Sequence, residues 1–357
     1  MSAGLDDSGG SEVSGVLSWF PIELPARQRV LGLFVAKWVI GALRPLVQLK
    51  IPDLLADGPR TAGQLAETTG ADPDSLYRAL RCVAAAGILR EPADGTFALT
   101  AAADGLRSDV DDGVRDMFLF TCDPMMWRPY EDMLHTVRTG EPAFDNVFGA
   151  PFFDFLRENA GSAALFDRAM TQNHYPGTDR VFEQFDFSRF PRIADVGGGR
   201  GQFLAEVLSR HPGCTGAVCD QPQVVAEAKA EFERRDVADR ASVVETDFFA
   251  EIPAGFDAYF IKHTLHNWND RDAVRILERV RAAIGDDADA RLLIVDMLLT
   301  GPGEWDLGKL TDIEMMAALG GRERGLAEWN RVAGAAGFVL ANDPVPGDLA
   351  LLEFRPV

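Results

Sequence analysis

The sequence predicts an α/β protein in which a Rossmann-like, mostly parallel sheet follows a helical N-terminal domain. From about Arg192 onward, short apolar runs alternate with amphipathic runs at helical spacing, the pattern of parallel strands covered by helices on both faces. Upstream of that point, helix-capping signals and helical spacing dominate. The 357 residues give room for about two domains.

The N-terminal segment predicts a tail followed by buried helices. Residues 1–20 are rich in Ser, Gly and Asp, a composition that predicts a disordered tail. The stretch from Leu24 to Leu55 is strongly apolar and contains Pro45 and Pro52; because proline ends or kinks a helix, we expect at least two helices. A helix that is apolar on most sides must be buried on most sides, so we expect a second copy of the chain to cover it in a homodimer.

Residues 61–99 carry the signals of two helices followed by a hairpin. The capping and helix-ending residues are Thr61, Gln64, Gly70, Asp72 and Pro73. Two strand-like segments, Ile88 to Arg90 and Thr96 to Leu99, are joined across Asp94-Gly95, a good hairpin turn. This order predicts a winged-helix-like dimerisation domain over residues 21–105.

Residues 106–184 predict a helical connector rich in aromatic and methionine side chains. Taken singly, such side chains pack in a core. Taken together, they can also line a pocket for a flat ligand. We therefore expect the connector, with Trp127 and Met170, to contribute to a substrate pocket.

Residues 185–357 predict the sheet domain. The strand-like runs are Arg192 to Val196, Gly216 to Asp220, Ala241 to Glu245, Asp257 to Ile261 and Leu292 to Val295. Helix-like runs between them include Gln202 to Arg210 and Asp270 to Ile284. The last two segments, Gly337 to Leu340 and Leu349 to Phe354, are separated by a Pro/Gly/Asp turn and predict a terminal antiparallel hairpin.

The strongest chemical signal is the run from Asp195 to Gly201, D-V-G-G-G-R-G, between a strand and a helix. Glycines there let the chain turn tightly and let a ligand approach the backbone. The spacing fits neither the dinucleotide fingerprint nor the phosphate-binding P-loop. Asp195 repels a pyrophosphate but suits the positively charged amino acid end of S-adenosylmethionine, so we expect this cofactor, with Gly197 and Gly199 against it.

Two further acids follow the next strands. Asp220 ends the second strand, where an acid in nucleotide-binding α/β folds binds ribose hydroxyls. Asp247 follows the third strand and can accept a hydrogen bond from an adenine amino group while Phe248 packs on the ring. Because these acids end successive strands, we expect them at one edge of the sheet.

His266 follows the fourth strand, in the run K-H-T-L-H-N-W-N-D that begins at Lys262. A histidine has an unperturbed pKa near 6.5 and a phenol one near 10, so an imidazole can accept a phenolic proton. We expect His266 to be a general base. Asp296, at the end of the fifth strand, and Glu323, in G-G-R-E-R, can orient and polarise it.

The chain resembles the small-molecule O-methyltransferases typified by plant caffeic acid and isoflavone enzymes, which have bacterial relatives that modify antibiotic polyketides. The resemblance rests on the runs Asp195 to Gly201, His266 to Asp270, Gly320 to Arg324 and Ile51-Pro52-Asp53-Leu54-Leu55. The resemblance covers about Leu31 to Phe354. It implies a class I methyltransferase sheet domain behind a dimerising winged-helix-like domain, and methylation of an aromatic hydroxyl in secondary metabolism.

By motif match, the resemblance implies that Gly197, Asp220, Asp247, Phe248 and Lys262 contact the cofactor. It makes His266 the base, flanked by Asp296 and Glu323, and places Met170 at the acceptor, where we also expect Trp127 and Asn267. The family usually has Asp at the position of Asn267 and often Thr at that of Gly325. Asn267 in place of the usual Asp bears on how the basicity of His266 is set and not on the presence of the histidine.

Three alternatives stay open. Some relatives bind the cofactor but catalyse hydroxylation or decarboxylation; they tend to lack the base, so His266 favours methyl transfer. A DNA-binding regulator needs excess positive charge, which residues 61–100 lack. A metal-dependent catechol-type enzyme needs a tight His/Asp/Glu cluster, which the spacing does not indicate, so we expect no metal.

Composition sets the remaining expectations. The net charge of −20 disfavours nucleic acid and suits a neutral or cationic small substrate. No apolar run reaches the length of about 18 residues that spans a bilayer, so we expect no membrane partner. The 4 cysteines are scattered without a CxxC pair and predict reduced thiols, hence a cytoplasmic protein.

Overall fold

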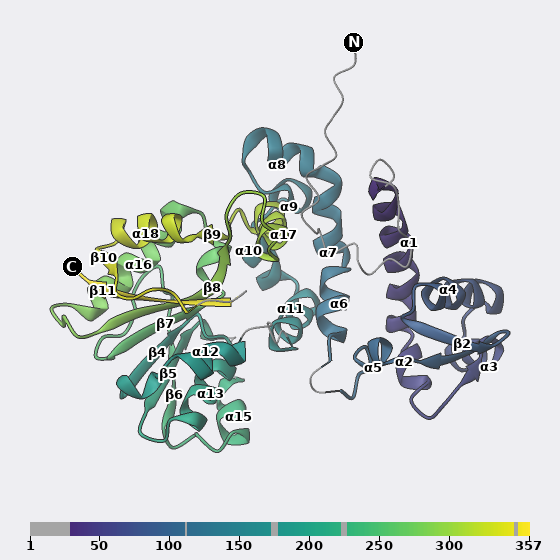
Figure 1. Cartoon of the computed structure of the whole chain (residues 1–357), viewed down its shortest axis with the longest axis horizontal. Coiled ribbons are helices and arrows are strands. Elements are labelled where there is room, and N and C mark those ends of the chain that lie inside the picture. The colour runs from purple at the N-terminus through teal and green to yellow at the C-terminus, as the bar shows by residue number, and fades with distance from the viewer. Residues whose placement is uncertain (1–28, 111–112, 173–177, 223–226, 346–348) are drawn as a thin grey trace, which may run out of the picture. The chain divides into compact units, whose positions relative to one another are not determined.

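The computed structural model describes residues 29–110, 113–172, 178–222, 227–345 and 349–357, so the predicted tail over 1–20 lies outside the described residues. The chain divides into two compact units (Figure 1). The helical unit comprises Met1–Trp127 and Asn159–Asn173, and the sheet unit comprises Arg128–Glu158 and His174–Val357. The predicted connector, 106–184, is divided between them, and the predicted domain boundaries stay predictions.

The helical unit opens with two helices and a small winged-helix-like module. Its elements are α1 (Arg29–Gln48), α2 (Ile51–Leu54), β1 (Arg60–Thr61), α3 (Ala62–Thr69), α4 (Pro73–Ala85), β2 (Leu89–Ala93), β3 (Thr96–Leu99), α5 (Ala101–Asp104), α6 (Arg115–Thr121), α7 (Pro124–Trp127) and α11 (Ala160–Gln172). The three strands form an antiparallel sheet in the order β1-β3-β2. Residues from α1 to α5 share one apolar core.

The predicted caps of the winged-helix-like module are confirmed. Thr61 and Gln64 form a reciprocal capping box, and Gly70 ends α3 in the left-handed conformation at φ 70°. The Asp72 side chain accepts a hydrogen bond from the Ser75 N–H at the start of α4. The turn across Asp94-Gly95 joins β2 to β3, so local signals were sufficient here.

The predicted break at Pro45 is wrong. Helix α1 continues through Pro45 to Gln48, and the chain turns at Lys50, whose φ is 56°. Pro45 lies in the last turn, where its missing N–H removes one hydrogen bond without ending the helix. The expected pair of helices is present, but the break between them lies at positions 49–50, after Pro45.

Helix α1 presents large apolar side chains that its own unit leaves uncovered. Val30, Leu33, Phe34 and Trp38 are exposed, Trp38 by 64%. Contiguous apolar surface of this kind marks an interaction site. None of the described helices is long and apolar enough to cross a membrane.

The sheet unit contains the predicted strand–helix alternation. Its helical elements are η3 (Arg128–Asp132), α8 (Met133–Thr139), α9 (Ala143–Phe148), α10 (Phe152–Glu158), α12 (Thr178–Gln184), η4 (Phe187–Arg189), α13 (Gln202–Arg210), α15 (Ala228–Arg234), η5 (Leu265–Asn267), α16 (Asp270–Ile284), α17 (Gly308–Glu314), η6 (Met315–Leu319) and α18 (Leu326–Ala335). Its strands are β4 (Arg192–Val196), β5 (Thr215–Asp220), β6 (Ala241–Glu245), β7 (Ala258–Lys262), β8 (Arg291–Leu299), β9 (Arg324–Gly325), β10 (Phe338–Leu340) and β11 (Leu349–Pro356).

The main sheet has the strand order β10-β11-β8-β7-β4-β5-β6, and β9 pairs with β8. The inner pairs are parallel, whereas β11 is antiparallel to both β8 and β10. The predicted terminal hairpin therefore inserts an antiparallel strand, as expected. Two apolar clusters occupy the two faces of this sheet and hold it between helices.

The register places the chemically important residues at one edge of the sheet. Val196 pairs with Cys219, Asp220 with Glu245 and Lys262 with Val295. Because these strands run parallel, their carboxyl ends meet at the same edge. The glycine run, Asp220 and the segment that carries His266 begin there.

Candidate active site

The glycine run turns sharply between β4 and α13. Gly197, Gly199 and Gly201 have φ values of 72°, 60° and 73°, a region that side-chain-bearing residues rarely adopt. A Cβ on Gly198 would lie 2.4 Å from the Asp195 carboxylate. The loop thus lies directly on Asp195, and a larger residue at 198 would separate them.

Asp195 is a buried carboxylate beneath this loop. Its side chain is 1% exposed, and Oδ2 has no hydrogen-bond partner among the described residues. Burial raises the pKa of Asp195 to about 7, although the charge of Lys262 acts in the opposite direction. Burial in turn lowers the pKa of Lys262. An unpaired buried oxygen of this kind is an acceptor available to a positively charged ligand group.

The other predicted cofactor residues border the same edge. Asp220 accepts a hydrogen bond from the Gly199 N–H at 2.9 Å, which ties β5 to the glycine loop. Asp247 is exposed and accepts from the Phe249 N–H. Phe248 packs edge-on against Trp268, with ring centroids 6.2 Å apart, so it lies next to the segment that carries His266.

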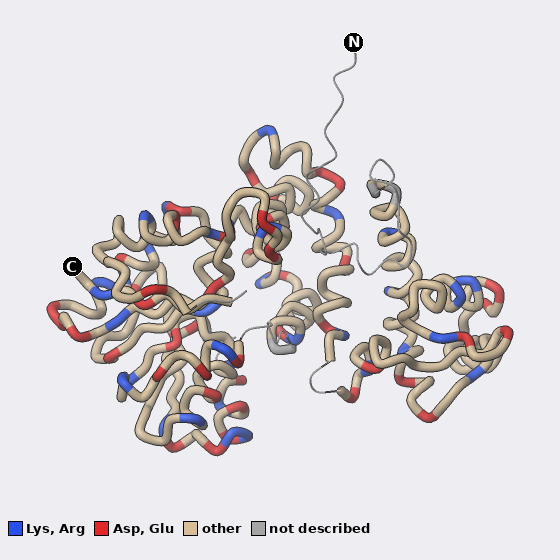
Figure 2. The backbone as a smooth tube through the Cα atoms, viewed as in Figure 1, with Lys and Arg blue, Asp and Glu red and all other residues tan. Residues whose placement is uncertain are grey.

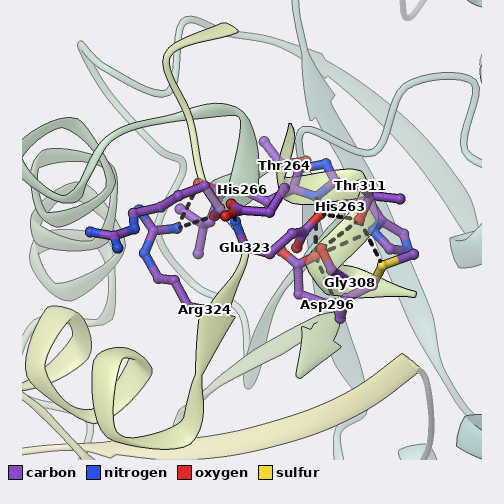
Figure 3. Close-up of polar contacts among 12 residues, drawn as sticks. His263, Thr264, His266, Asp296, Gly308, Thr311, Glu323 and Arg324 are labelled. Carbon is purple, nitrogen blue, oxygen red and sulfur yellow. Dashed lines mark hydrogen bonds and ion pairs between the residues drawn. The ribbon is translucent and has the colours of Figure 1, made fainter. Parts of the chain in front are cut away.

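His266 lies on η5 against two buried carboxylates (Figure 3). Its Nδ1 is 2.9 Å from Glu323 Oε1 and 3.3 Å from Asp296 Oδ1. Both acids are 1% exposed. Because both acceptors face Nδ1, that nitrogen carries the proton, and the neutral ring has its lone pair on Nε2.

These contacts set the charge of the imidazole. Burial lowers the pKa of His266, but the charges of Asp296 and Glu323 and the hydrogen bond that His266 donates to Glu323 outweigh it and raise the pKa to about 9. Burial opposes ionisation of Asp296, yet its histidine neighbours hold its pKa below the usual value. Burial raises the pKa of Glu323. Asp296 is therefore the acid held ionised beside the ring.

A backbone clamp fixes the segment that carries His266. The Arg322 N–H donates to the His266 carbonyl oxygen at 2.8 Å, and a Cβ on Gly321 would lie 2.1 Å from that same oxygen. The Arg324 side chain is fully buried and donates to the carbonyl oxygens of Leu265, at 3.1 Å, and Trp268, at 2.7 Å. The G-G-R-E-R run thus supplies both an acid and the support for the base.

Two family models match the chain. An O-methyltransferase domain matches residues 130–339, and an O-methyltransferase dimerisation domain matches residues 32–109. The chain belongs to the O-methyltransferase family. The resemblance expected from the sequence motifs is confirmed, as are the methyltransferase fold and the enzyme class.

Curated and solved relatives cover nearly the whole chain. An 8-amino-8-demethylriboflavin N,N-dimethyltransferase of Streptomyces davaonensis is 40% identical over 94% of this chain and 98% of its own. The crystal structure of LaPhzM has a TM-score of 0.88 at 33% identity, covering 94% of this chain and 100% of that one. The O-methyltransferase NcsB1 from neocarzinostatin biosynthesis, solved with S-adenosylmethionine and 2-hydroxy-5-methyl naphthoic acid, has a TM-score of 0.76 at 29% identity over 90% of this chain and 96% of that one.

Sequence reasoning missed three contributors to this O-methyltransferase site. His263 has a φ of 46° and brings Nδ1 to 3.3 Å from Asp296 Oδ1. Thr311, on α17, contacts Glu323 Oε1 at 3.3 Å. Arg324 holds the backbone around His266, a role that the G-G-R-E-R motif does not by itself predict. The short H-x-x-H spacing of His263 and His266 was the one local signal that pointed to a cluster.

The expectation that no tight cluster of metal-ligating side chains forms is wrong. His263, His266 and Asp296 offer ligand atoms that all lie within 4.8 Å of one another. Asp296 lies about 30 residues from the histidines in sequence but adjacent to them in space, because β7 and β8 are neighbouring parallel strands. That no metal takes part in the reaction stays a prediction.

The remaining predicted residues divide between the units. Asn267 lies on η5 beside His266, and its backbone packs against Gly321; the carboxylates at the His266 ring are Asp296 and Glu323. Trp127 and Met170 belong to the helical unit, where they are 37% and 38% exposed. Their contribution to an acceptor pocket stays a prediction. The N–H of Gly325 donates to Glu328 at the start of α18.

Proposed function

We propose that this enzyme transfers a methyl group from S-adenosylmethionine to a phenolic hydroxyl of an aromatic small molecule in secondary metabolism. The observation that carries the proposal is the buried His266, held by two carboxylates at the edge of the sheet where the glycine loop turns. Thr264 links the segment that carries His266 to the glycine loop, because its hydroxyl donates to the Gly197 carbonyl oxygen at 3.3 Å.

The residues present fit S-adenosylmethionine. The unpaired Asp195 Oδ2 below the loop suits an ammonium group, Asp220 suits ribose hydroxyls, and Asp247 with Phe248 suits an adenine ring. Gly197, Gly199 and Lys262 complete the proposed cofactor site. When bound, the cofactor supplies an electrophilic methyl group on a positively charged sulfur. A pyrophosphate would meet the Asp195 carboxylate, so the loop disfavours a dinucleotide.

His266 then acts as the general base. Its Nε2 accepts the acceptor's phenolic proton while the oxygen takes the methyl group, and the resulting imidazolium is stabilised by Asp296 and Glu323 through Nδ1–H. The His266 pKa of about 9 lies close to that of a phenol, near 10, so the proton transfer is nearly balanced. Such a base contributes about 10²–10⁴-fold, and correct orientation about 7–11 kcal/mol of the barrier.

Removal of the base tests this proposal. His266→Ala should reduce turnover by about 10²–10⁴-fold and leave S-adenosylmethionine affinity within about threefold, because the ring lies outside the proposed cofactor contacts. Calorimetric titration with S-adenosylmethionine, S-adenosylhomocysteine and NAD provides the affinities. Turnover close to that of the unchanged enzyme would refute the role of His266; a chain that binds NAD instead would refute the cofactor.

We further propose that the enzyme is a homodimer that closes over the apolar face of α1, since Leu33, Phe34 and Trp38 are uncovered there and the dimerisation family model spans them. Trp127 and Met170 remain proposed acceptor contacts. A DNA-binding role is disfavoured by charge: acidic and basic positions are mixed along the winged-helix-like module (Figure 2). The 4 cysteines carry no disulfide, which supports a reducing, cytoplasmic location.

A further inference from the structure

A carboxylate on α17, the helix that contacts Glu323, has one oxygen without a hydrogen-bond partner among the described residues. Glu314 ends α17. Its Oε2 accepts a hydrogen bond from the Tyr130 hydroxyl at 2.6 Å. Its Oε1 is buried and has no hydrogen-bond partner among the described residues. A buried acceptor without a donor costs about 1–3 kcal/mol of stability, and more when it is charged. The position of this oxygen therefore needs a physical explanation.

Among the described residues, no positive charge offsets the Glu314 carboxylate. Burial raises the pKa of Glu314, opposed by the Tyr130 hydrogen bond and by no positive charge among the described residues. Burial also raises the pKa of Tyr130, as does the neighbouring Glu314 charge. A tie between two helical segments needs only one acceptor oxygen, since Tyr130 uses Oε2 alone.

The position of Glu314 connects it to the catalytic group. It lies three residues after Thr311 on α17, and residues at that spacing are neighbours on a helix surface. Thr311 contacts Glu323, one of the two carboxylates at His266, at 3.3 Å. Glu314 is followed by η6, a π-helical turn that packs against η5, the segment carrying His266. Such π turns are frequent at functional sites.

The pair is within reach of a ligand. Tyr130 is 41% exposed and its hydroxyl donates to Glu314, so the pair begins at a side chain that solvent reaches, while Oε1 of Glu314 is buried. An ionised carboxylate is an acceptor on both oxygens. With Oε2 engaged by Tyr130, Oε1 can be satisfied by an O–H or N–H donor from a ligand.

We propose that Glu314, held by Tyr130, is a polar anchor of the acceptor site that recognises a hydroxyl or amino group carried by the aromatic acceptor away from the methylated atom. This inference rests on the proposed function. The net charge of −20 acts in the same direction, because it favours neutral or cationic ligands over anionic ones.

Ligand binding tests the anchor without requiring turnover. The enzyme loaded with S-adenosylhomocysteine is titrated with four probes of matched shape: a naphthol, an aminonaphthol, a dihydroxynaphthalene and a methoxynaphthol. We expect the aminonaphthol and the dihydroxynaphthalene, which carry a second donor besides the hydroxyl that all four share, to bind at least about tenfold more tightly than the other two, as a hydrogen bond to a charged group provides. In Glu314→Leu this advantage should fall below about threefold, and Glu314→Gln should keep part of it.

Two controls separate recognition from structure. Tyr130→Phe leaves the carboxylate in place, so it should keep the preference for donors; Glu278→Gln, at an exposed glutamate of α16, should change nothing. Equal binding of all four probes, or equal loss of preference in Tyr130→Phe and Glu314→Leu, would overturn the anchor. If S-adenosylhomocysteine binds but no naphthol does, the aromatic acceptor class fails and the anchor fails with it.

Discussion

The charge of His266 provides the sharpest test of the catalytic site, through the change Asp296→Asn. Asp296 is 1% exposed and lies 3.3 Å from His266 Nδ1. It is the stronger of the two charges that raise the pKa of His266 to about 9. Below that pKa the ring is an imidazolium and cannot accept a proton, so activity should fall as the pH decreases through about 9.

The expected shift follows from removing this charge. An opposite charge at contact distance moves a pKa by about 1–3 units, so Asp296→Asn should lower the pKa of His266 by that amount. Because the pKa of His266 lies above 7, the ring is mostly protonated at pH 7 before the change; the variant should have a larger neutral fraction. Glu323→Gln should shift the pKa less, because burial raises the pKa of Glu323 and weakens its charge.

The assay is kcat/KM measured from about pH 6 to about pH 10 for the unchanged enzyme and both variants. The acid limb should move to lower pH in the order Glu323→Gln, then Asp296→Asn, even though the plateau rate drops as the ring loses an orienting acceptor. Repeating the profile with a more acidic phenolic substrate distinguishes titration of the enzyme from titration of the substrate. If His266 sets the acid limb, that limb stays at the same pH with both phenols. An unmoved limb, or one shifted to higher pH, would refute the role assigned to the carboxylates.

Three further outcomes are expected. Arg324→Met should destabilise the fold by about 1–3 kcal/mol, measured by urea unfolding, because the Trp268 carbonyl oxygen loses the donor that Arg324 supplies, whereas the Leu265 carbonyl keeps the Trp268 N–H; a change too small to measure would refute the clamp. Gly198→Ala should weaken S-adenosylmethionine binding by about tenfold in calorimetry, because the added Cβ meets Asp195 at 2.4 Å; Gly334→Ala, with open space around its Cβ position, is the control, and equal affinities would contradict this account. Trp38→Asp should convert the proposed homodimer to a monomer in analytical ultracentrifugation, since it places a charge on an apolar face; an unchanged sedimentation coefficient would locate the dimer contact elsewhere.

Local signals were sufficient for much of the fold. Helix α16 begins and ends at the predicted residues, Asp270 and Ile284, because its cap and apolar spacing are contained in the segment itself. The same holds for β4, β6 and α13. At Pro45 the local rule failed, because the consequence of a proline depends on where in the helix it lies.

The sequence by itself determined the family, the strand–helix alternation and the residue types of the site: a glycine loop, acids that end successive strands, and a histidine. These follow from patterns within a few residues. Only the tertiary structure decided that His263 and His266 both reach Asp296 and that Arg324 holds the segment around His266. It also decided that one oxygen of Glu314 has no hydrogen-bond partner in the described part of the chain. The reason is physical: burial, charge and hydrogen-bond partners come from residues distant in sequence, and strand register brings them together.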